Sequence, residues 1–314
     1  MSETLDVFHL QEILAEIWRL KSNVATFNLI VFIDDPTRRA WIHERALRIA
    51  EKHPSRLIIL DACDASGKVR VCASELYLSV GKLDANAVAT LTRELSAPDV
   101  PNVLWWSSEC LIENDLFGVL IEHCDRVVMD SSGACNDEST LRRLLCFVQP
   151  IKPLRDLAWM RLTPWREMIA QFFDDPEMHV DLSSLATLEI TSGSTAEALY
   201  LAGWLASRLD WTPEDECTFR AADGSRVSLK KIDEGEKRRV VRVALATKDS
   251  RYVAQLSDDE NVVELSIEGP KSRPRRLVPL KNIDNASLIE QAILTDANDE
   301  AFDASLHILR ELLP

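Results

Sequence analysis

The run of apolar residues from Phe27 to Ile33 constrains the fold of this chain more than any other feature. A nearly continuous apolar run of this length is typical of a strand covered on both faces, as in a sheet flanked by helices. A helical spacing of apolar residues follows, at Trp41, Ile42, Ala46 and Ile49. A second buried run extends from Leu57 to Leu60. Strand, helix and strand in this order form a βαβ unit, whose crossover is nearly always right-handed. The sequence therefore predicts an α/β domain with a mainly parallel, helix-flanked sheet.

The same alternation continues to the middle of the chain. The pattern predicts an initial helix through Val7, Leu10, Leu14 and Ile17, further strands at 69–73, 76–80, 103–106 and 127–129, and helices at 84–96, 114–123 and 138–148. The segment Gln149-Pro150-Ile151-Lys152-Pro153 has two prolines and no periodicity, so we predict a domain boundary there. Residues 1–150 are then a Rossmann-like α/β domain.

Residues 151–314 carry a different pattern. Thr163-Pro164 and Ser194, with Glu197 three residues later, are typical of helix starts. After Pro213 the apolar residues recur at every second position, as in strands with one solvated face. Such positions are Val227 and Leu229, then Val241, Val243 and Leu245, then Val263, Leu265 and Ile267. The sequence predicts an α+β domain with an antiparallel sheet, closed by helices between Ile283 and Leu313.

Charge and hydropathy exclude several classes of protein. The chain has 36 Lys and Arg against 51 Asp and Glu, a formal net charge of −15. This excess opposes binding to nucleic-acid phosphates and to anionic lipid surfaces. No stretch approaches the roughly 18 unbroken apolar residues of a membrane span, and the first residues lack the order of a signal peptide. We expect a cytoplasmic protein.

Motifs that normally announce catalysis are missing from the sequence. It contains no G-x-G-x-x-G and no G-x-x-x-x-G-K. Its six histidines show no zinc-binding spacing, and none of its seven cysteines forms a C-x-x-C. A G-x-S-x-G nucleophile turn is missing too. The sequence therefore predicts no metal, no cofactor and no enzymatic activity.

One arrangement still offers a ligand site. Asp34, Asp61 and Asp130 each follow a predicted strand of the first domain. Ligands of open α/β sheets bind beyond the carboxyl ends of the strands, so these residues, with Trp106, form a candidate pocket for a small ligand. The alternative is that the acidic residues begin loops and cap the next helices.

Basic residues gather in the second half. Residues 226–276 contain 13 Lys and Arg against 9 Asp and Glu, a local charge of +4. Arg226, Lys230 and Arg242 would share one face of the predicted sheet, with Arg273, Arg275 and Arg276 nearby. Such a face is either simply solvated or provides electrostatic docking for an acidic partner. A basic sheet in an acidic chain also allows self-association.

Residues 156–167 carry an unusual string, Asp-Leu-Ala-Trp-Met-Arg-Leu-Thr-Pro-Trp-Arg-Glu, followed by Phe172-Phe173-Asp174. This string resembles the glucose-6-phosphate dehydrogenase assembly proteins, the OpcA family. Residues 201–209 with Trp211 are similar to the family as well, as are the segments 26–31, 53–60, 101–106 and 125–131. The resemblance covers roughly residues 20–211, and only loosely the basic sheet and the C-terminal segment.

The resemblance implies a non-enzymatic partner that binds glucose-6-phosphate dehydrogenase and promotes its active oligomer or conformation, without nucleic acid or membrane. It points to six candidate residues: Trp159, Arg161, Trp165, Arg166, Trp204 and Arg208. Large rings and guanidinium groups serve either partner binding or the junction between domains. The alternative function is a sensor that binds a sugar phosphate or nucleotide at the carboxyl ends of the N-terminal strands. A third hypothesis, an enzyme using Asp34, Asp61 or Asp130, has only their position in its favour.

Overall fold

The structure is a computed structural model that describes residues 3–6, 25–71, 75–110, 115–148, 153–234, 238–280, 284–296 and 298–313. The helix predicted from Val7 to Ile17 lies outside these residues. The described residues form two compact units. The first unit takes them from 1–130, 147–156 and 285–295, and the second unit from 131–146, 157–284 and 296–314.

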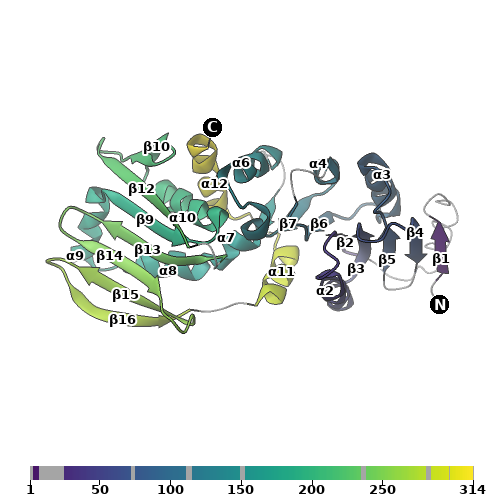
Figure 1. The fold of residues 1–314 in the computed structure, drawn as a ribbon, viewed down its shortest axis with the longest axis horizontal. Coiled ribbons are helices and arrows are strands. Elements are labelled where there is room, and N and C mark those ends of the chain that lie inside the picture. Colours follow the sequence, from purple (N-terminus) through teal and green to yellow (C-terminus); the bar gives the residue numbers. More distant parts are fainter. Residues whose placement is uncertain are drawn as a thin grey trace. The chain divides into compact units, whose positions relative to one another are not determined.

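An eight-stranded sheet organises the first unit (Figure 1). Its strands, in spatial order, are β1 (Glu3–Asp6), β4 (Lys68–Val71), β5 (Leu76–Ser79), β3 (Ser55–Asp61), β2 (Phe27–Ile33), β6 (Asn102–Trp106), β7 (Arg126–Met129) and β8 (Leu154–Asp156). The β1–β4 and β4–β5 pairs are antiparallel, and the strands from β5 to β8 pair in parallel. The side chains of Leu29 to Ile33 are at most 1% exposed. The predicted helix-flanked, mainly parallel sheet is confirmed.

Helices cover this sheet on both faces. Helix α2 (Arg39–Lys52) joins β2 to β3 and packs on both, while α3 (Ala85–Leu95) packs against α4 (Asp115–Glu122), which lies on β6. The crossover through α2 leads from β2 to β3, and the crossover through α4 leads from β6 to β7, in the opposite direction across the sheet. Because both crossovers are right-handed, α2 and α4 lie on opposite faces of the sheet. Helix α11 (Asn285–Leu294) joins from far along the chain: it packs on β7 and β8, and its Glu290 pairs with Lys52 at 3.1 Å.

The units are interleaved in sequence, whereas the prediction places a single boundary after residue 150. Residues 154–156 are not a linker, because they form β8 and pair in parallel with β7. Helices α5 (Ser131–Ala134) and α6 (Glu138–Phe147) instead begin in the second unit, where Lys231 and Glu138 form an ion pair. The chain passes between the units at 130/131, 146/147 and 156/157, on either side of the predicted boundary. Hydrogen bonding and packing decide to which unit the residues before and after this boundary belong, and composition does not reveal either.

A second eight-stranded sheet organises the second unit. Its strands, in spatial order, are β10 (Thr212–Asp215), β11 (Thr218–Arg220), β12 (Arg226–Asp233), β9 (Thr187–Ser192), β13 (Val240–Ala246), β14 (Arg251–Leu256), β15 (Val262–Glu268) and β16 (Arg273–Pro279). Only β9 and β12 pair in parallel. The alternating pattern places apolar and charged side chains on opposite faces of the sheet, as predicted. Val227 and Leu229 are buried, while Arg226 and Lys230 are exposed. The predicted antiparallel sheet with helices is confirmed.

Helices pack on the apolar face of this sheet (Figure 1). They are α7 (Leu157–Arg161), α8 (Thr163–Gln171), α9 (Pro176–His179) with a 3-10 turn at Val180–Ser184, α10 (Thr195–Arg208) and α12 (Glu300–Leu312). The Ser194 hydroxyl accepts a hydrogen bond from the backbone N–H of Glu197 at 3.3 Å, as predicted for an N-cap. Helix α8 also begins at the predicted residue, but the Thr163 hydroxyl accepts from Arg166 at 3.0 Å instead of capping the backbone.

Helices α10 and α12 approach closely at Gly203. A Cβ at this position would lie 2.7 Å from Oγ and 2.8 Å from the carbonyl oxygen of Ser305, whose hydroxyl donates to the Tyr200 carbonyl at 2.9 Å. A methyl group therefore has no room unless the two helices move apart. Gly118 in α4 differs, because a Cβ there meets only Phe147 Cε1, at 3.5 Å.

This contrast gives a matched pair of substitutions. We expect Gly203→Ala to lower the free energy of unfolding by about 1–3 kcal/mol, because overpacking separates α10 from α12. We expect Gly118→Ala to raise it by up to about 1 kcal/mol, because alanine favours the helix and the space is free. Denaturant unfolding followed by circular dichroism measures both. Equal effects of the two variants would contradict the close approach of α10 and α12.

Candidate functional site

The carboxyl ends of β2 and β6 lie side by side at the point where the strand order of the first sheet reverses. Ligands of open α/β sheets bind at this switch point. Here the Ser108 hydroxyl donates to the Asp34 carboxylate, and the Ser107 backbone N–H donates to the Phe32 carbonyl at 3.3 Å. The Asp34 side chain is therefore held in place by the strand next to its own.

The turn that leads from β2 into α2 is Asp34-Asp35-Pro36-Thr37-Arg38. The Asp35 carboxylate accepts from the hydroxyl of Thr37 at 2.6 Å and from its backbone N–H at 2.8 Å. These hydrogen bonds lower the pKa of Asp35. A dinucleotide pyrophosphate needs glycines at this turn and free N–H groups at the helix start. This turn has no glycine, and its two carboxylates, offset in part by the charge of Arg38, disfavour a phosphate.

Asp61, at the end of β3, is completely buried. It accepts from the Tyr77 hydroxyl, from Arg39 Nη2 at 2.5 Å and from the backbone N–H of Cys63 at 2.9 Å. Burial, and then the hydrogen bond to Asp61, raises the pKa of Tyr77 to about 12. The phenol is therefore neutral at physiological pH and acts as a donor. Asp61 is one of the predicted pocket residues, whereas Tyr77 and Arg39 are not. The pairing of β3 with β5 brings Tyr77 to Asp61, and the packing of α2 on β3 brings Arg39.

The other two predicted pocket residues lie elsewhere. Trp106 is 1% exposed and packs between Phe32, stacked at 4.1 Å between ring centroids, and Phe117, edge-on at 4.9 Å. Asp130 follows β7 and is half-buried. Since β6 separates β7 from β2, the backbone of Asp130 lies two strand spacings, about 10 Å, from that of Asp34. The structure thus brings Asp34 and Asp61 together and leaves Asp130 apart.

Trp159 is the centre of an aromatic cluster in the second unit. It is 2% exposed, stacks on Phe302 at 4.9 Å between centroids, and donates its indole N–H to Asp299 at 2.7 Å. Asp299 also caps α12 by accepting from the Phe302 backbone N–H at 3.0 Å. An acidic residue just before an apolar helical pattern is the signal that would have located this partner in the sequence.

Arg166 covers the exposed side of Trp159. Its guanidinium carbon lies 3.7 Å from the centre of the Trp159 ring, and its Nη1 donates to the Trp159 carbonyl at 3.1 Å. Burial lowers the pKa of Arg166 to about 10, so the group is still charged at neutral pH. It forms no ion pair with any carboxylate in the described part of the chain. The charges of Asp299 and Glu167 act on Arg166 from beyond ion-pair distance and partly counter this lowering of its pKa. The guanidinium can therefore still receive a carboxylate in direct contact.

Arg161 has a different environment. Its Nε donates to the Glu197 carboxylate at 3.0 Å and its Nη2 donates to the Ser132 hydroxyl at 2.7 Å. Glu197 is 2% exposed and also accepts from the Val240 backbone N–H at 3.0 Å. Arg161 therefore fixes α5, α7, α10 and β13 together. This is a structural task, in line with the junction interpretation of the motif.

The remaining three motif residues differ in their exposure. Trp165 is 4% exposed and belongs to the core. Trp204 is half-buried and Arg208 is exposed, one turn apart on the same face of α10. Arg208 is close enough to Arg166 to lower its pKa further. We call Arg166, Trp204 and Arg208 the α8–α10 patch.

Of the predicted docking residues on the open face of the second sheet, two are paired within the chain. Arg226 pairs with Glu214 at 2.7 Å, and Arg242 pairs with Glu189, which also binds Arg251 at 3.0 Å. Lys230 is exposed and makes no hydrogen bond or ion pair with any described residue. Most of the basic character of this face is therefore compensated locally.

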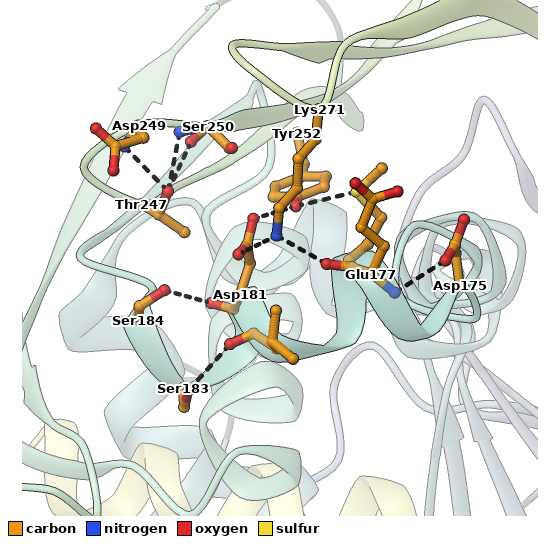
Figure 2. A network of polar contacts seen from close by, with 12 residues as sticks. Asp175, Glu177, Asp181, Ser183, Ser184, Thr247, Asp249, Ser250, Tyr252 and Lys271 are labelled. Carbon is orange, nitrogen blue, oxygen red and sulfur yellow. Dashed lines mark hydrogen bonds and ion pairs between the residues drawn. The ribbon is translucent and has the colours of Figure 1, made fainter.

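The basic residues at the sheet edge are also paired. Figure 2 shows Lys271 donating to the Glu177 carbonyl and to the Asp181 carboxylate, both at 2.7 Å. The buried Tyr252 donates to the same carboxylate at 2.5 Å, and Arg273 binds Glu177 at 2.6 Å. Burial would raise the pKa of Asp181, but the Lys271 and Tyr252 contacts lower it. This network anchors α9 to the edge of the sheet.

The described residues contain no group of three or more His, Cys, Asp or Glu side chains arranged to hold a metal ion. They also contain no helix long and apolar enough to cross a membrane.

Known protein families match most of the chain. Residues 46–146 match the family described as glucose-6-phosphate dehydrogenase subunit N-terminal domain, and residues 152–306 match the corresponding C-terminal domain. The curated relatives include a protein called putative OxPP cycle protein OpcA from Synechocystis sp., 36% identical over 146 residues. This alignment covers 46% of the chain and 30% of the relative. A protein of the same name from Synechococcus elongatus is 32% identical over 179 residues, which cover 56% of the chain and 39% of the relative. The matches thus span only about a third of these relatives' length.

Solved structures share the fold at low identity. An aldose-aldose oxidoreductase from Caulobacter crescentus has a TM-score of 0.51 at 10% identity, over 91% of this chain and 95% of the other. An oxidoreductase from Sinorhizobium meliloti has a TM-score of 0.51 at 11% identity, with the same coverage of both chains. At this identity the likeness concerns the fold alone.

The Tyr77–Asp61 hydrogen bond has a measurable pH dependence. We expect Tyr77→Phe to lower the free energy of unfolding at pH 8 by about 1–3 kcal/mol, because buried Asp61 loses a donor. The pKa of Tyr77 is raised in the folded state, so its contribution is complete below pH 10 and decreases as the pH approaches 12. Denaturant unfolding of both proteins at several pH values measures this. A stability difference that does not change between pH 8 and pH 11.5 would contradict the assignment.

Proposed function

The chain belongs to the glucose-6-phosphate dehydrogenase subunit family that includes the OpcA proteins, and from this we propose that it binds glucose-6-phosphate dehydrogenase and promotes its active oligomer or conformation. In this proposal the chain itself is not a catalyst, and its role lies in the oxidative pentose phosphate cycle named for its relatives. The partner and the effect are taken from the family names and from the resemblance of residues 156–167.

The turn between β2 and α2 is the observation that carries the non-catalytic part of the proposal. A Rossmann-like sheet normally binds a dinucleotide through this turn. Here the Asp35 carboxylate accepts from the backbone N–H of Thr37, Asp34 is bound to Ser108, and Pro36 lacks an N–H. Two negative charges therefore stand where a pyrophosphate would lie. This arrangement argues against dinucleotide-dependent catalysis in the manner usual for the fold.

The α8–α10 patch is the docking surface that we favour. It joins a half-buried aromatic ring, Trp204, to the exposed cation Arg208, and Arg166 lies within electrostatic range. Desolvated aromatic and arginine side chains contribute most of the binding energy at many interfaces. A carboxylate of the dehydrogenase at Arg166 would also offset the burial of a guanidinium that has no direct ion pair with a described residue.

The open sheet face is the weaker docking candidate. Arg226 and Arg242 already bind carboxylates of the chain, so a partner carboxylate would have to compete with Glu214 and Glu189. Lys230 remains available, but a single exposed lysine contributes little to affinity.

Activation requires only differential binding. If the chain binds the active conformation of the dehydrogenase better than the inactive one, linkage shifts the population toward the active form. A tenfold shift corresponds to about 1.4 kcal/mol of differential binding free energy. An interface with a few well-placed arginine and tryptophan contacts can supply this difference.

Charge reversal on the two faces tests the proposal. We expect Arg208→Glu to weaken binding to the cognate glucose-6-phosphate dehydrogenase by at least about tenfold, because an exposed cation of the patch becomes a repelling anion. Lys230→Glu should change the affinity by less than about threefold, in the range of exposed ion pairs. Mass photometry gives the complex, and the rate of NADPH production gives the activation.

Lys248→Glu serves as the matched control, since Lys248 is exposed in the β13–β14 turn and contacts no described residue through hydrogen bonds or ion pairs. Loss of binding with Lys230→Glu alone would move the docking surface to the open sheet face. Failure of the unchanged protein to form any complex or to alter the rate would overturn the proposed function itself.

A further inference from the structure

A cavity of about 460 Å³ opens in the first unit beside the carboxyl ends of β3 and β5, and Pro36 of the turn from β2 into α2 forms part of its wall. It lies between the first turn of α2, the loop after β3, and the strands β4 and β5. Its wall includes Arg39, His43, Asp64, Ser66, Lys68 and Arg70. Cavities of a few hundred Å³ with a small number of convergent polar groups are typical of small-molecule sites.

Two buried carboxylates hold the cationic wall in position. Asp61 binds Arg39, and Glu75, which is 6% exposed, binds Arg70 at 2.8 Å and His43 at 2.6 Å. Burial would raise the pKa of Glu75, but the His43 and Arg70 contacts lower it, so the carboxylate stays charged. Arg70 also lies over the Tyr77 ring, 4.6 Å from its centre. The two guanidinium groups are thus preorganised before any ligand arrives.

Donors of the wall remain for a ligand. Arg39 uses Nε and Nη2 toward Tyr77 and Asp61, and Arg70 uses Nη2 toward Glu75, so Nη1 of each has no partner among the described residues. Both side chains are about two-fifths exposed, at 40% and 42%. Lys68 is exposed and forms no hydrogen bond or ion pair within the same ranges. Two guanidinium groups and one ammonium group therefore converge on one cavity.

The opposite part of the wall has hydroxyl groups and a carboxylate. Asp64 accepts from the Ser79 hydroxyl and from the Ser66 backbone N–H, both at 2.8 Å. These bonds lower its pKa, so Asp64 is an anion that still has acceptor capacity. A carboxylate of this kind repels a bare anion but accepts hydrogen bonds from sugar hydroxyls. The cavity therefore combines donors for an anionic group with acceptors for hydroxyl groups.

We propose that this cavity binds a phosphorylated sugar, with the phosphate toward Lys68, Arg39 and Arg70 and the hydroxyls toward Asp64 and Ser66. A phosphate offers several acceptor oxygens in different directions, which suits three cationic donors from β4 and α2 better than a planar carboxylate does. The volume exceeds the need of a single inorganic ion. The site does not depend on the proposed dehydrogenase partner, because it lies wholly within the first unit.

Calorimetric titration of the purified full chain, without any dehydrogenase, tests the site. The probes are glucose 6-phosphate and ribose 5-phosphate, with glucose and inorganic phosphate as the two halves of the first probe. We expect at least one sugar phosphate to bind at least about tenfold more tightly than inorganic phosphate, and glucose not to bind. Lys68→Gln should weaken the binding of the sugar phosphate by at least about tenfold, because one charge-assisted hydrogen bond is lost.

Lys248→Gln is the matched control, as it removes an exposed lysine from the second unit and should leave the affinity unchanged. The Lys68 side chain has no hydrogen bond or ion pair with a described residue to lose, so both variants should unfold at the temperature of the unchanged protein. Absence of binding by both sugar phosphates at millimolar concentration would overturn the proposal. Equal affinities of the two variants, or binding of inorganic phosphate as tight as that of the sugar phosphates, would mean an adventitious ion only.

Discussion

The second unit depends on one buried ion pair, between Glu197 and Arg161. The Glu197 carboxylate lies in the first turn of α10, where the helix dipole favours a negative charge, and only 2% of the residue is exposed. It accepts from Arg161 and from the backbone of Val240, while Arg161 also reaches Ser132. Removal of one member would leave an uncompensated charge inside the protein. The loss in free energy of unfolding would then be far larger than the net stabilisation that the pair provides. The motif around residues 156–167 is therefore foremost a device that positions α7 and α8, and the accessible α8–α10 patch depends on it.

The first unit has the sheet of a dinucleotide-binding fold without the phosphate-binding turn that usually accompanies it. Its sheet has the order and the switch point of a dinucleotide-binding domain, yet the turn into α2 carries carboxylates in place of glycines. Cationic groups are found instead on β4 and at the start of α2, where Asp61 binds Arg39 and Glu75 binds Arg70. The groups that would contact a cofactor in such a fold are thus not found at the usual turn. The fold therefore does not indicate the function, which depends on the side chains present.

The sequence predicted those features that repeat locally. The apolar run of β2, the period of α2 and the alternation in β12 and β13 each depend on neighbouring residues, and all are confirmed. Features that depend on distant pairing were not accessible. Tyr77 meets Asp61 only through the β3–β5 register, and β8 is too short to differ from a linker until it pairs with β7. Glu197 was read as half of a capping box, whereas its carboxylate turns toward Arg161. The tryptophans of the motif gave no indication of which side chains are accessible.

The interleaving of the units also governs the order in which the molecule can be completed during synthesis. The strands β7 and β8 leave the ribosome long before α11, which packs on them. A nascent chain therefore leaves β7 and β8 without α11 until residues 157–284 of the second unit have been made. The first unit is N-terminal in sequence but is finished late, so the two units share one assembly process.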